Sequence, residues 1–386
     1  IYFLVTSSAG YVPNYYKFYS ENSDGEQVLI QASGASNSAI WVINQTGVLN
    51  IFGQSSIDEI DWVDMALSFT SNASQQLFDV YTDAIIGNSL INRRLAYIAS
   101  LARLRRDADN DVADFTPTSA DVPPRINEDS IASNATPSSH NGDTLGVFSS
   151  GDDAFASTLK NQLLSGGLEL VQSTTSNQPK VVDNGVVTEL GGIPSLLFNG
   201  SSTTFLAWSD TTAPLSFQSL SDAISVVFKI NPNAVSQNNT ANWYPRYTVC
   251  EFREISSFGG TNVPFSIGIN NSRIHVGVVS GGAVDILIST ATVSASTSYS
   301  VGISIDNETV KIYIDGVLDS THTIVNATAS REVGNSDSTL SIGVRTRDSA
   351  LSNDDYYDGY LIGDAINVFP SVKTAANFLD IHNNFY

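Results

Sequence analysis

The chain has 386 residues, 42% of them hydrophobic, and its 39 acidic residues against 18 lysines and arginines give a formal net charge of −21. A chain of this length exceeds what one core usually organises, so we expect two or three structural units. The negative charge repels phosphate backbones and anionic lipid headgroups, which argues against nucleic-acid binding and against docking on membranes. It suits a salty medium, bound cations or the solubility of an abundant extracellular or particle-borne protein.

The N-terminal residues predict a small β-rich unit. Short apolar strands are expected at residues 28–30, 39–43 and 48–52, separated by turns rich in glycine, serine and asparagine. We therefore expect residues 1–56 to form an N-terminal β-rich attachment unit. The opening apolar run, IYFLV, is too short for a membrane span or the apolar part of a signal peptide, so no membrane insertion is expected.

Residues 57–170 are expected to form a connector of mixed helix, strand and loop, part of which packs on the following domain. A helix is predicted from Ser74 to Ile86, because serine is a good N-cap and apolar residues recur at three- and four-residue intervals. Alternation over residues 101–105 suits a strand with arginines on one face. Residues 115–151 are rich in Pro, Ser, Asn and Asp, and we expect a long surface loop or linker there.

Residues 171–386 predict a large antiparallel β-sandwich, so the chain as a whole is mainly β. Asn-Gly or Gly-Gly turns at residues 184–185, 191–192 and 199–200 separate short apolar runs. Nine or more strands without a helical period between them favour two packed sheets over a parallel α/β sheet, whose crossovers would need amphipathic helices. The expected strands cover residues 196–198, 224–230, 265–269, 274–279, 284–288, 299–305, 310–314, 340–344 and 360–368.

The cysteine and histidine content gives no sign of a disulfide or a zinc site. Cys250 is the only cysteine, lies in an apolar strand-like context, and is predicted to be a small buried side chain. The histidines lack the spacing of zinc ligands. They are His140, His275, His322 and His382.

One acidic pattern could bind calcium. Asp107, Asp109 and Asp111 place carboxylates at alternate positions, and carboxylate oxygens are the ligands that Ca²⁺ prefers. An EF-hand loop would need glycine at its sixth position and glutamate at its twelfth, where this chain has Val112 and Thr118. A calcium site of another kind therefore stays open, although no cofactor is required. The alternative is structural, with neutralisation of the aspartates by Arg103, Arg105 and Arg106.

Two aromatic segments could recognise sugars, because carboxylates accept hydrogen bonds from hydroxyls and aromatic rings stack on the apolar face of a pyranose. The first is residues 353–359, an acidic and aromatic turn before the last strand. The second follows the polar loop at residues 231–242. The alternative for both is packing of the rings onto the sandwich edge. The candidate glycan-binding residues are Trp243, Tyr244, Tyr247, Asp354, Asp355, Tyr356, Tyr357 and Asp358.

Residues 101–117, LARLRRDADNDVADFTP, resemble the segment that precedes concanavalin A-like, laminin G-like sandwiches in many phage tail and virion proteins. In those proteins a segment of the type TxxNQPxxVxxGVVxxxxGxPxLxFxG follows, and it is matched here from Thr174 to Gly200. Residues 38–53 also resemble the strand-turn-strand repeats of phage tail-fibre shafts. These resemblances imply a concanavalin A-like jelly roll at residues 171–386.

A related arrangement occurs in fungal-type α-L-arabinofuranosidase catalytic domains. That family has a Tyr-Asp-Gln-Ser-Gly motif before the NQP-like segment, whereas residues 158–167 of this chain lack the Tyr-Asp pair. The family's disulfide-forming cysteines are absent as well. A retaining hydrolase also needs two carboxyl groups roughly 5 Å apart, which a sequence does not reveal.

The resemblances lead us to expect a non-enzymatic virion appendage or surface protein of the phage tail-fibre or decoration type. It would lie on the exterior of a tail or capsid, or on another extracellular surface. Its partners would be other virion or surface-assembly subunits, further copies of the chain in a homo-oligomer, and a host cell-surface glycan. Two alternatives stay open, namely a glycoside hydrolase or lyase acting on cell-surface polysaccharide, and a purely architectural capsid, tail or filament subunit.

Overall fold

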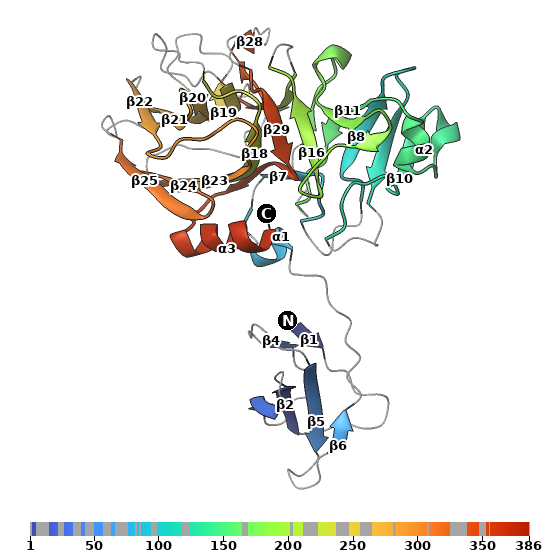
Figure 1. Ribbon diagram of the computed structural model, residues 1–386, viewed down its shortest axis with the longest axis vertical. Helices are drawn as coiled ribbons and strands as arrows, with labels where there is room; N and C mark the ends of the chain where they lie inside the picture. The colour runs from blue at the N-terminus through green and yellow to red at the C-terminus, as the bar shows by residue number, and fades with distance from the viewer. Residues whose placement is uncertain are drawn as a thin grey trace. The chain divides into compact units, whose positions relative to one another are not determined.

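The computed structural model divides the chain into two compact units, Ile1–Gln75 and Gln76–Tyr386 (Figure 1). In the first unit the structure describes the strand residues given below. In the second it describes residues 76–385 except 82, 85, 94–98, 118–122, 164–168, 201–203, 211–222, 237–246, 255–264, 281–282, 307–308, 325–337, 347–352 and 355.

The first unit is β-rich, as predicted. Four of its strands form an antiparallel sheet in the order β3-β2-β5-β6, and β1 pairs with β4. The predicted strands correspond to β3, β4 and β5, whereas the tyrosine-rich β2 was not predicted. The strands are β1 (Tyr2–Leu4), β2 (Tyr15–Glu21), β3 (Gln27–Ser33), β4 (Ile40–Val42), β5 (Asn50–Ser56) and β6 (Val63–Met65).

The second unit contains two antiparallel sheets, which we call sheet I and sheet II. Sheet I consists of β12 (Leu170–Val171), β17 (Leu206–Asp210), β19 (Tyr247–Glu254), β20 (Phe265–Asn270), β21 (Arg273–Ser280), β22 (Ala283–Ile288) and β26 (Ser338–Ile342). Their order across the sheet is β22-β21-β20-β19-β26-β17-β12. Sheet I therefore brings together strands from three separated parts of the chain.

Sheet II is formed by β7 (Ile86–Ser89), β13 (Lys180–Asp183), β16 (Ile193–Phe198), β18 (Ile224–Pro232), β23 (Tyr299–Asp306), β24 (Thr309–Ile314), β25 (Val317–Thr323), β29 (Gly359–Ile362) and β30 (Asp364–Phe369). It begins with β25-β24-β23-β18, and β18 pairs with both β29 and β30. Strand β29 continues to β16 and β13, and β30 continues to β7. Strand β11 (Ala154–Leu159) links the sheets because it pairs with both β12 and β13.

The core lies between the sheets and confirms the predicted antiparallel sandwich. Alternate residues of each strand face inwards, among them Phe252 and Ile267 of sheet I and Phe228 and Ile303 of sheet II, all fully buried. Burying each such side chain contributes about 1.5–3 kcal/mol. Cys250 is also fully buried, as its sequence context predicted, and burial raises the pKa of its thiol.

Tight turns connect several strands where the sequence places asparagine or glycine. Asn184 and Gly185 have φ angles of 50° and 82° between β13 and β14 (Val186–Val187), which fits a two-residue hairpin turn. Gly191 and Gly192 join β15 (Glu189–Leu190) to β16 in the same way, with φ angles of 62° and 75°. The long strand predicted at residues 360–368 is divided into β29 and β30 by Gly363.

Residues 76–169 belong to the same compact unit as the sandwich. Strands β8 (Ala102–Arg106), β9 (Val112–Thr116) and β10 (Ile131–Thr136) form a sheet that joins β11. The prediction of a strand around residues 101–105 is therefore confirmed. The prediction of a loop at residues 115–151 is wrong, because β10 pairs with β9 and is followed by the short helix α2 (Leu145–Ser149).

The helix predicted from Ser74 to Ile86 is mostly absent from the described residues. Only α1 (Leu77–Val80) is helical, because Ile86 and the next three residues pair with β30 as strand β7. A longer helix that was not predicted, α3 (Ala375–Phe385), lies against sheet II at the C-terminal end (Figure 1). Phe378 of α3 stacks on Tyr313 of β24 with ring centroids 4.2 Å apart. Among the residues that the structure describes, no helix has both the length and the apolar character of a membrane span.

Candidate functional site

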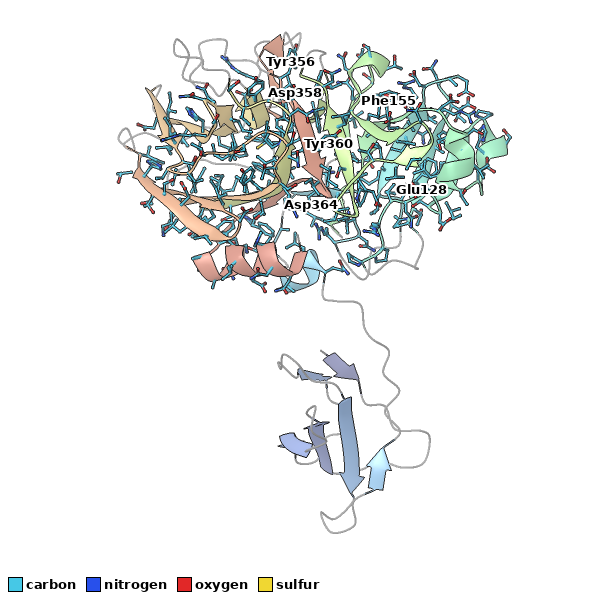
Figure 2. The ribbon with its side chains drawn as sticks, in the orientation of Figure 1. Glu128, Phe155, Tyr356, Asp358, Tyr360 and Asp364 are labelled. Carbon is cyan, nitrogen blue, oxygen red and sulfur yellow. The ribbon has the colours of Figure 1, made fainter. Side chains whose placement is uncertain are left out.

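A short segment, Tyr356–Tyr360, leads from sheet I into strand β29, and we call it the rim segment. Before it, β28 (Asn353–Asp354) pairs with β27 (Arg345–Thr346). Tyr356 forms an isolated bridge with Thr248 of β19 in sheet I, whereas Tyr360 pairs with Asn231 of β18 in sheet II. The segment thus spans the end of the sandwich, and Figure 2 shows Tyr356, Asp358 and Tyr360 in succession along it.

Tyr357 anchors the rim segment in the core. Its side chain is fully buried, its ring lies 6.1 Å from that of Phe198, and its hydroxyl donates to the carbonyl of Tyr360 at 3.1 Å. Burial raises the pKa of the phenol well above its usual value. The Tyr357 backbone N–H also donates to the carbonyl of Gly343 at 2.9 Å. These contacts fix the backbone on both sides of the ring.

Asp358 is held in one orientation by its neighbours. The Asn233 backbone N–H donates to the Asp358 carbonyl at 2.9 Å, and the Asn233 side-chain amide donates to the Asp358 carboxylate at 3.1 Å. Gly200 allows this approach, because a Cβ atom there would lie only 2.5 Å from the Cβ of Asp358. The carboxylate is only partly buried, so it keeps acceptor capacity for a ligand.

The candidate sugar-binding residues have different surroundings. Tyr356 and Asp358 are partly exposed, and they come together on the rim segment with Tyr360. Tyr247 and Tyr357 are core residues, so among the described candidates we carry the stacking role over to Tyr356. The backbone of Asp354 is described without its side chain, and Trp243, Tyr244 and Asp355 lie outside the described residues.

The three aspartates proposed for calcium act as partners of arginines. Arg105 bonds Asp107 at 3.1 Å, and the Arg106 guanidinium bonds Asp109 and, at 3.0 Å, Asp111. Arg106 lowers the pKa of Asp109 to about 2. In the described part of the chain, no group of three or more His, Cys, Asp and Glu side chains is arranged to hold a metal ion. The described residues therefore provide no cluster of ligands for the predicted calcium site.

His140 extends this charged network. Its Nδ1 lies 2.8 Å from the carboxylate of Asp143 and its Nε2 lies 3.1 Å from that of Asp111. Arg103 pairs with Asp114 instead, at 3.2 Å. The network joins the β8–β9 turn to the segment after β10, so its evident role is to hold these turns together.

Sequence reasoning missed a fully buried carboxylate, Glu251, on the face of sheet I that points away from the core. Its neighbours Cys250 and Phe252 face the core, so Glu251 must face the other way. Its cross-strand partners are Ser266 on one side and Ser341 on the other, both fully buried. The signal was available, because the strands FSIGIN, HVGVV and LSIGV carry serine or glycine at alternate positions.

His275, on the same face, should make stability depend on pH. Burial and the nearby Arg273 lower its pKa from 6.5 to about 4, so the unfolded chain binds more protons than the folded chain between these values. Stability should therefore fall as pH decreases from 6.5 towards 4, by up to about 3 kcal/mol for this residue. Urea unfolding of the wild type and of His275→Gln at pH 7.5 and 4.5 isolates the contribution. A wild-type minus variant difference that stays constant between the two pH values would contradict it.

A family match supports the fold. Residues 209–377 match the family described as the concanavalin A-like lectin/glucanases superfamily. A GH54 α-L-arabinofuranosidase structure is 10% identical with a TM-score of 0.49, over 80% of this chain and 64% of that one. The binding domain of botulinum neurotoxin serotype G is 12% identical with a TM-score of 0.37, over 55% of this chain. The chain spans only 48% of that domain's length.

Domain 4 of AbnA, a GH43 extracellular arabinanase from Geobacillus stearothermophilus solved with arabinotriose, is 17% identical with a TM-score of 0.35. That match covers 51% of this chain and 81% of the other. No curated protein matches the chain. The match of residues 209–377 to that family, together with the antiparallel strand pairing, gives the second unit a concanavalin A-like, laminin G-like sandwich fold.

Proposed function

We propose that the second unit is a glycan-binding module carried by a virion appendage or another extracellular surface protein, and that its ligand is a host cell-surface glycan. The observation that carries this proposal is the fixed rim segment at the end of a sandwich whose residues 209–377 match a family of lectins and glucanases. Proteins with this fold serve in binding, in catalysis or in assembly, so the fold does not identify the function. The assignment has to rest on the residues of the site.

The rim segment has the chemistry that a sugar needs. The partly exposed Asp358 carboxylate accepts hydrogen bonds from hydroxyls, and the neighbouring Tyr356 offers an aromatic ring. The two bonds from Asn233 hold Asp358 in place before a ligand arrives, and the buried Tyr357 fixes the backbone between Tyr356 and Asp358. Little conformational entropy is then lost on binding, which raises the affinity of a small contact area.

The charge of the chain narrows the class of glycan. At a formal net charge of −21, the protein repels polyanionic polysaccharides at long range, so a neutral glycan is the better ligand. The separate β-rich unit, Ile1–Gln75, is suited to attachment to other subunits of a virion or surface assembly. Such an assembly would include further copies of the chain and would display the second unit to the exterior.

A glycan array with the purified chain tests the function. We expect binding to neutral host glycans, a loss of roughly tenfold or more for Tyr356→Ala, and near-complete retention for Tyr356→Phe, because stacking on one aromatic ring contributes about 0.5–1.5 kcal/mol beyond the buried area. Equal binding by the wild type and Tyr356→Ala would show that the rim segment is not part of the glycan-binding site.

The enzyme alternative predicts a different outcome for the same glycans. Incubation with a bound polysaccharide should leave the number of reducing ends unchanged, because a binding module does not cut the chain. New reducing ends would favour a hydrolase and contradict the proposed function. Absence of binding to any glycan, with the protein still incorporated into particles, would favour the architectural alternative.

A further inference from the structure

Strand β7 is the first strand of the second unit, so a force that acts between the two units reaches the sandwich through α1 and β7. Strand β7 pairs with β30 in antiparallel register, from Ile86 opposite Val368 to Ser89 opposite Asp364. The chain that comes from the first unit therefore enters this strand pair at the Ile86 end.

The rim segment reaches the same strand pair from the opposite end. It leads into β29, and β29 and β30 run in one direction along β18, where Tyr360 lies opposite Asn231 and Phe369 lies opposite Ser225. The rim segment is thus joined to β30 at its Asp364 end, whereas α3 follows β30 beyond Phe369. Figure 1 shows α1 and α3 together at one side of the second unit and β28, which precedes the rim segment, at the other.

The two points of entry decide how a force acts on the strand pair. Hydrogen bonds between antiparallel strands lie perpendicular to the strands. A force that pulls β7 at Ile86 and β30 at Asp364 acts along the strands in opposite directions, so the bonds are loaded together. A force that pulls both strands at the Ile86 end opens the bonds one after another. The first kind of loading resists the larger force, because the bonds share the load.

A second set of contacts holds the segment before β7, and we call it the clasp. The Lys373 ammonium donates to both carboxylate oxygens of Asp83, at 2.7 Å and 2.8 Å. The Tyr81 hydroxyl donates to the Asp380 carboxylate of α3 at 2.7 Å. The Lys373 ammonium also lies 5.1 Å from the ring centre of Tyr81 and 4.7 Å from that of Phe369. The clasp therefore joins the segment before β7 to the segment after β30.

Apolar packing under the clasp ties it to sheet II. Leu77 of α1 and Tyr81 form one buried cluster with Phe378 and Ile381 of α3 and with side chains of sheet II. Gly302 of β23 permits this packing, because a Cβ atom there would lie 2.4 Å from the ring of Phe378. Helix α3 thus keeps the α1 segment on sheet II as long as α3 itself is not pulled away.

We infer that β7, β30 and the clasp form a mechanical clamp, which keeps the second unit folded under a force between a bound glycan and the first unit. This inference rests on the proposed function, which puts the glycan at the rim segment and assigns attachment to the first unit. Under that load β7 and β30 are sheared, and α3 lies outside the loaded path, so the clasp stays closed. A force at the C-terminus instead removes α3 first, which opens the clasp and separates the strands from the Ile86 end.

Single-molecule force spectroscopy of the full-length chain tests the clamp. One chain carries cysteine handles from Ser74→Cys and Tyr356→Cys, and the other from Ser74→Cys and Tyr386→Cys. Cys250 is fully buried, so it does not compete for the handles. We expect the first rupture to need at least about twice the force with the rim handle, because forced unfolding depends on the barrier to unfolding. Equal forces, or a larger force with the C-terminal handle, overturn the clamp.

Lys373→Met isolates the clasp. It should lower the rupture force by about one-fifth or more with the rim handle and leave the force with the C-terminal handle unchanged, because α3 then detaches before the load reaches Lys373. Lys180→Met is the matched control, since Lys180 also bonds two aspartates, Asp153 and Asp183, but lies on β13. It should behave like the wild type in both directions.

An equal fall in both directions for Lys373→Met, or no fall in either, overturns the role of the clasp. The handles need no glycan, so the mechanical result is independent of the glycan array. A direction-dependent force together with a failed array rejects the proposed function and keeps the clamp, whereas equal forces together with glycan binding reject the clamp alone.

Discussion

Replacing Asp364 by asparagine should destabilise the second unit by about 3–5 kcal/mol, which is the cost of leaving one partner of a buried ion pair without its counter-charge. The Arg93 guanidinium donates to both carboxylate oxygens of Asp364, at 2.8 Å and 2.9 Å, and the two side chains are 2% and 0% exposed. Asn367 donates a further bond to the same carboxylate at 2.9 Å. Figure 2 places Asp364 at the end of the β29 segment opposite to Tyr356. Urea unfolding of the whole chain measures the loss.

An exposed pair in the same unit is the control. Asp183 bonds Lys180 at 2.9 Å, but its side chain is 58% exposed, so Asp183→Asn should cost no more than about 1 kcal/mol. A double replacement, Arg93→Met with Asp364→Leu, should recover much of the stability, because no charge is then left buried. Similar losses of stability for Asp364→Asn and Asp183→Asn would show that the buried ion pair stabilises the unit no more than the exposed pair does.

Gly343→Ala should cost about 2–5 kcal/mol and should also weaken glycan binding. The residue has a φ angle of +86°, and a Cβ atom there would lie 2.3 Å from the ring of the fully buried Phe198. Left-handed backbone costs a residue with a side chain about 1–2 kcal/mol, and overpacking a core adds about 1–3 kcal/mol. Because the Gly343 carbonyl accepts the N–H of Tyr357, a shift there also moves the rim segment.

Gly277→Ala is the matched glycine variant for stability. It lies on the same sheet but has neither a positive φ angle nor a close neighbour, so its unfolding free energy should change by less than about 1 kcal/mol. Thermal unfolding of the two variants side by side makes the comparison. If Gly343→Ala were as stable as Gly277→Ala, the close approach of Phe198 would not exclude a side chain at position 343.

The strands between residues 193 and 369 could be predicted because the sequence pattern that marks each strand and turn is local. All nine expected strands are present there, since alternate apolar side chains reach the core and glycine or asparagine supplies the turns. The predictions fail where pairing with strands distant in the sequence determines the secondary structure. The sequence around Ile86 has helical periodicity, but pairing with β30 gives those residues backbone partners in a sheet. In β10 only Ala132 and Ala135 are buried, which is too little apolar surface for its pattern to stand out.

The candidate site was predicted in part for a similar reason. The sequence marks residues 353–359 as an acidic and aromatic turn, but it does not say which ring points inwards. The structure buries Tyr357 against Phe198 and leaves Tyr356 partly exposed. Glu251 and Ser266 were missed because their relation is a register between strands β19 and β20, which depends on a bulge between Thr248 and Cys250. Register is set by packing and turn geometry together and is not readable from either strand alone.

A crystal structure of the whole chain, grown with the neutral hexasaccharide that binds most tightly, tests the central claim most directly. We expect sugar density against the rim segment, with one ring over Tyr356 and a hydroxyl within hydrogen-bond distance of the Asp358 carboxylate. Sugar density on the outer face of sheet II or against α3, or an unliganded second unit at saturating hexasaccharide, would contradict it.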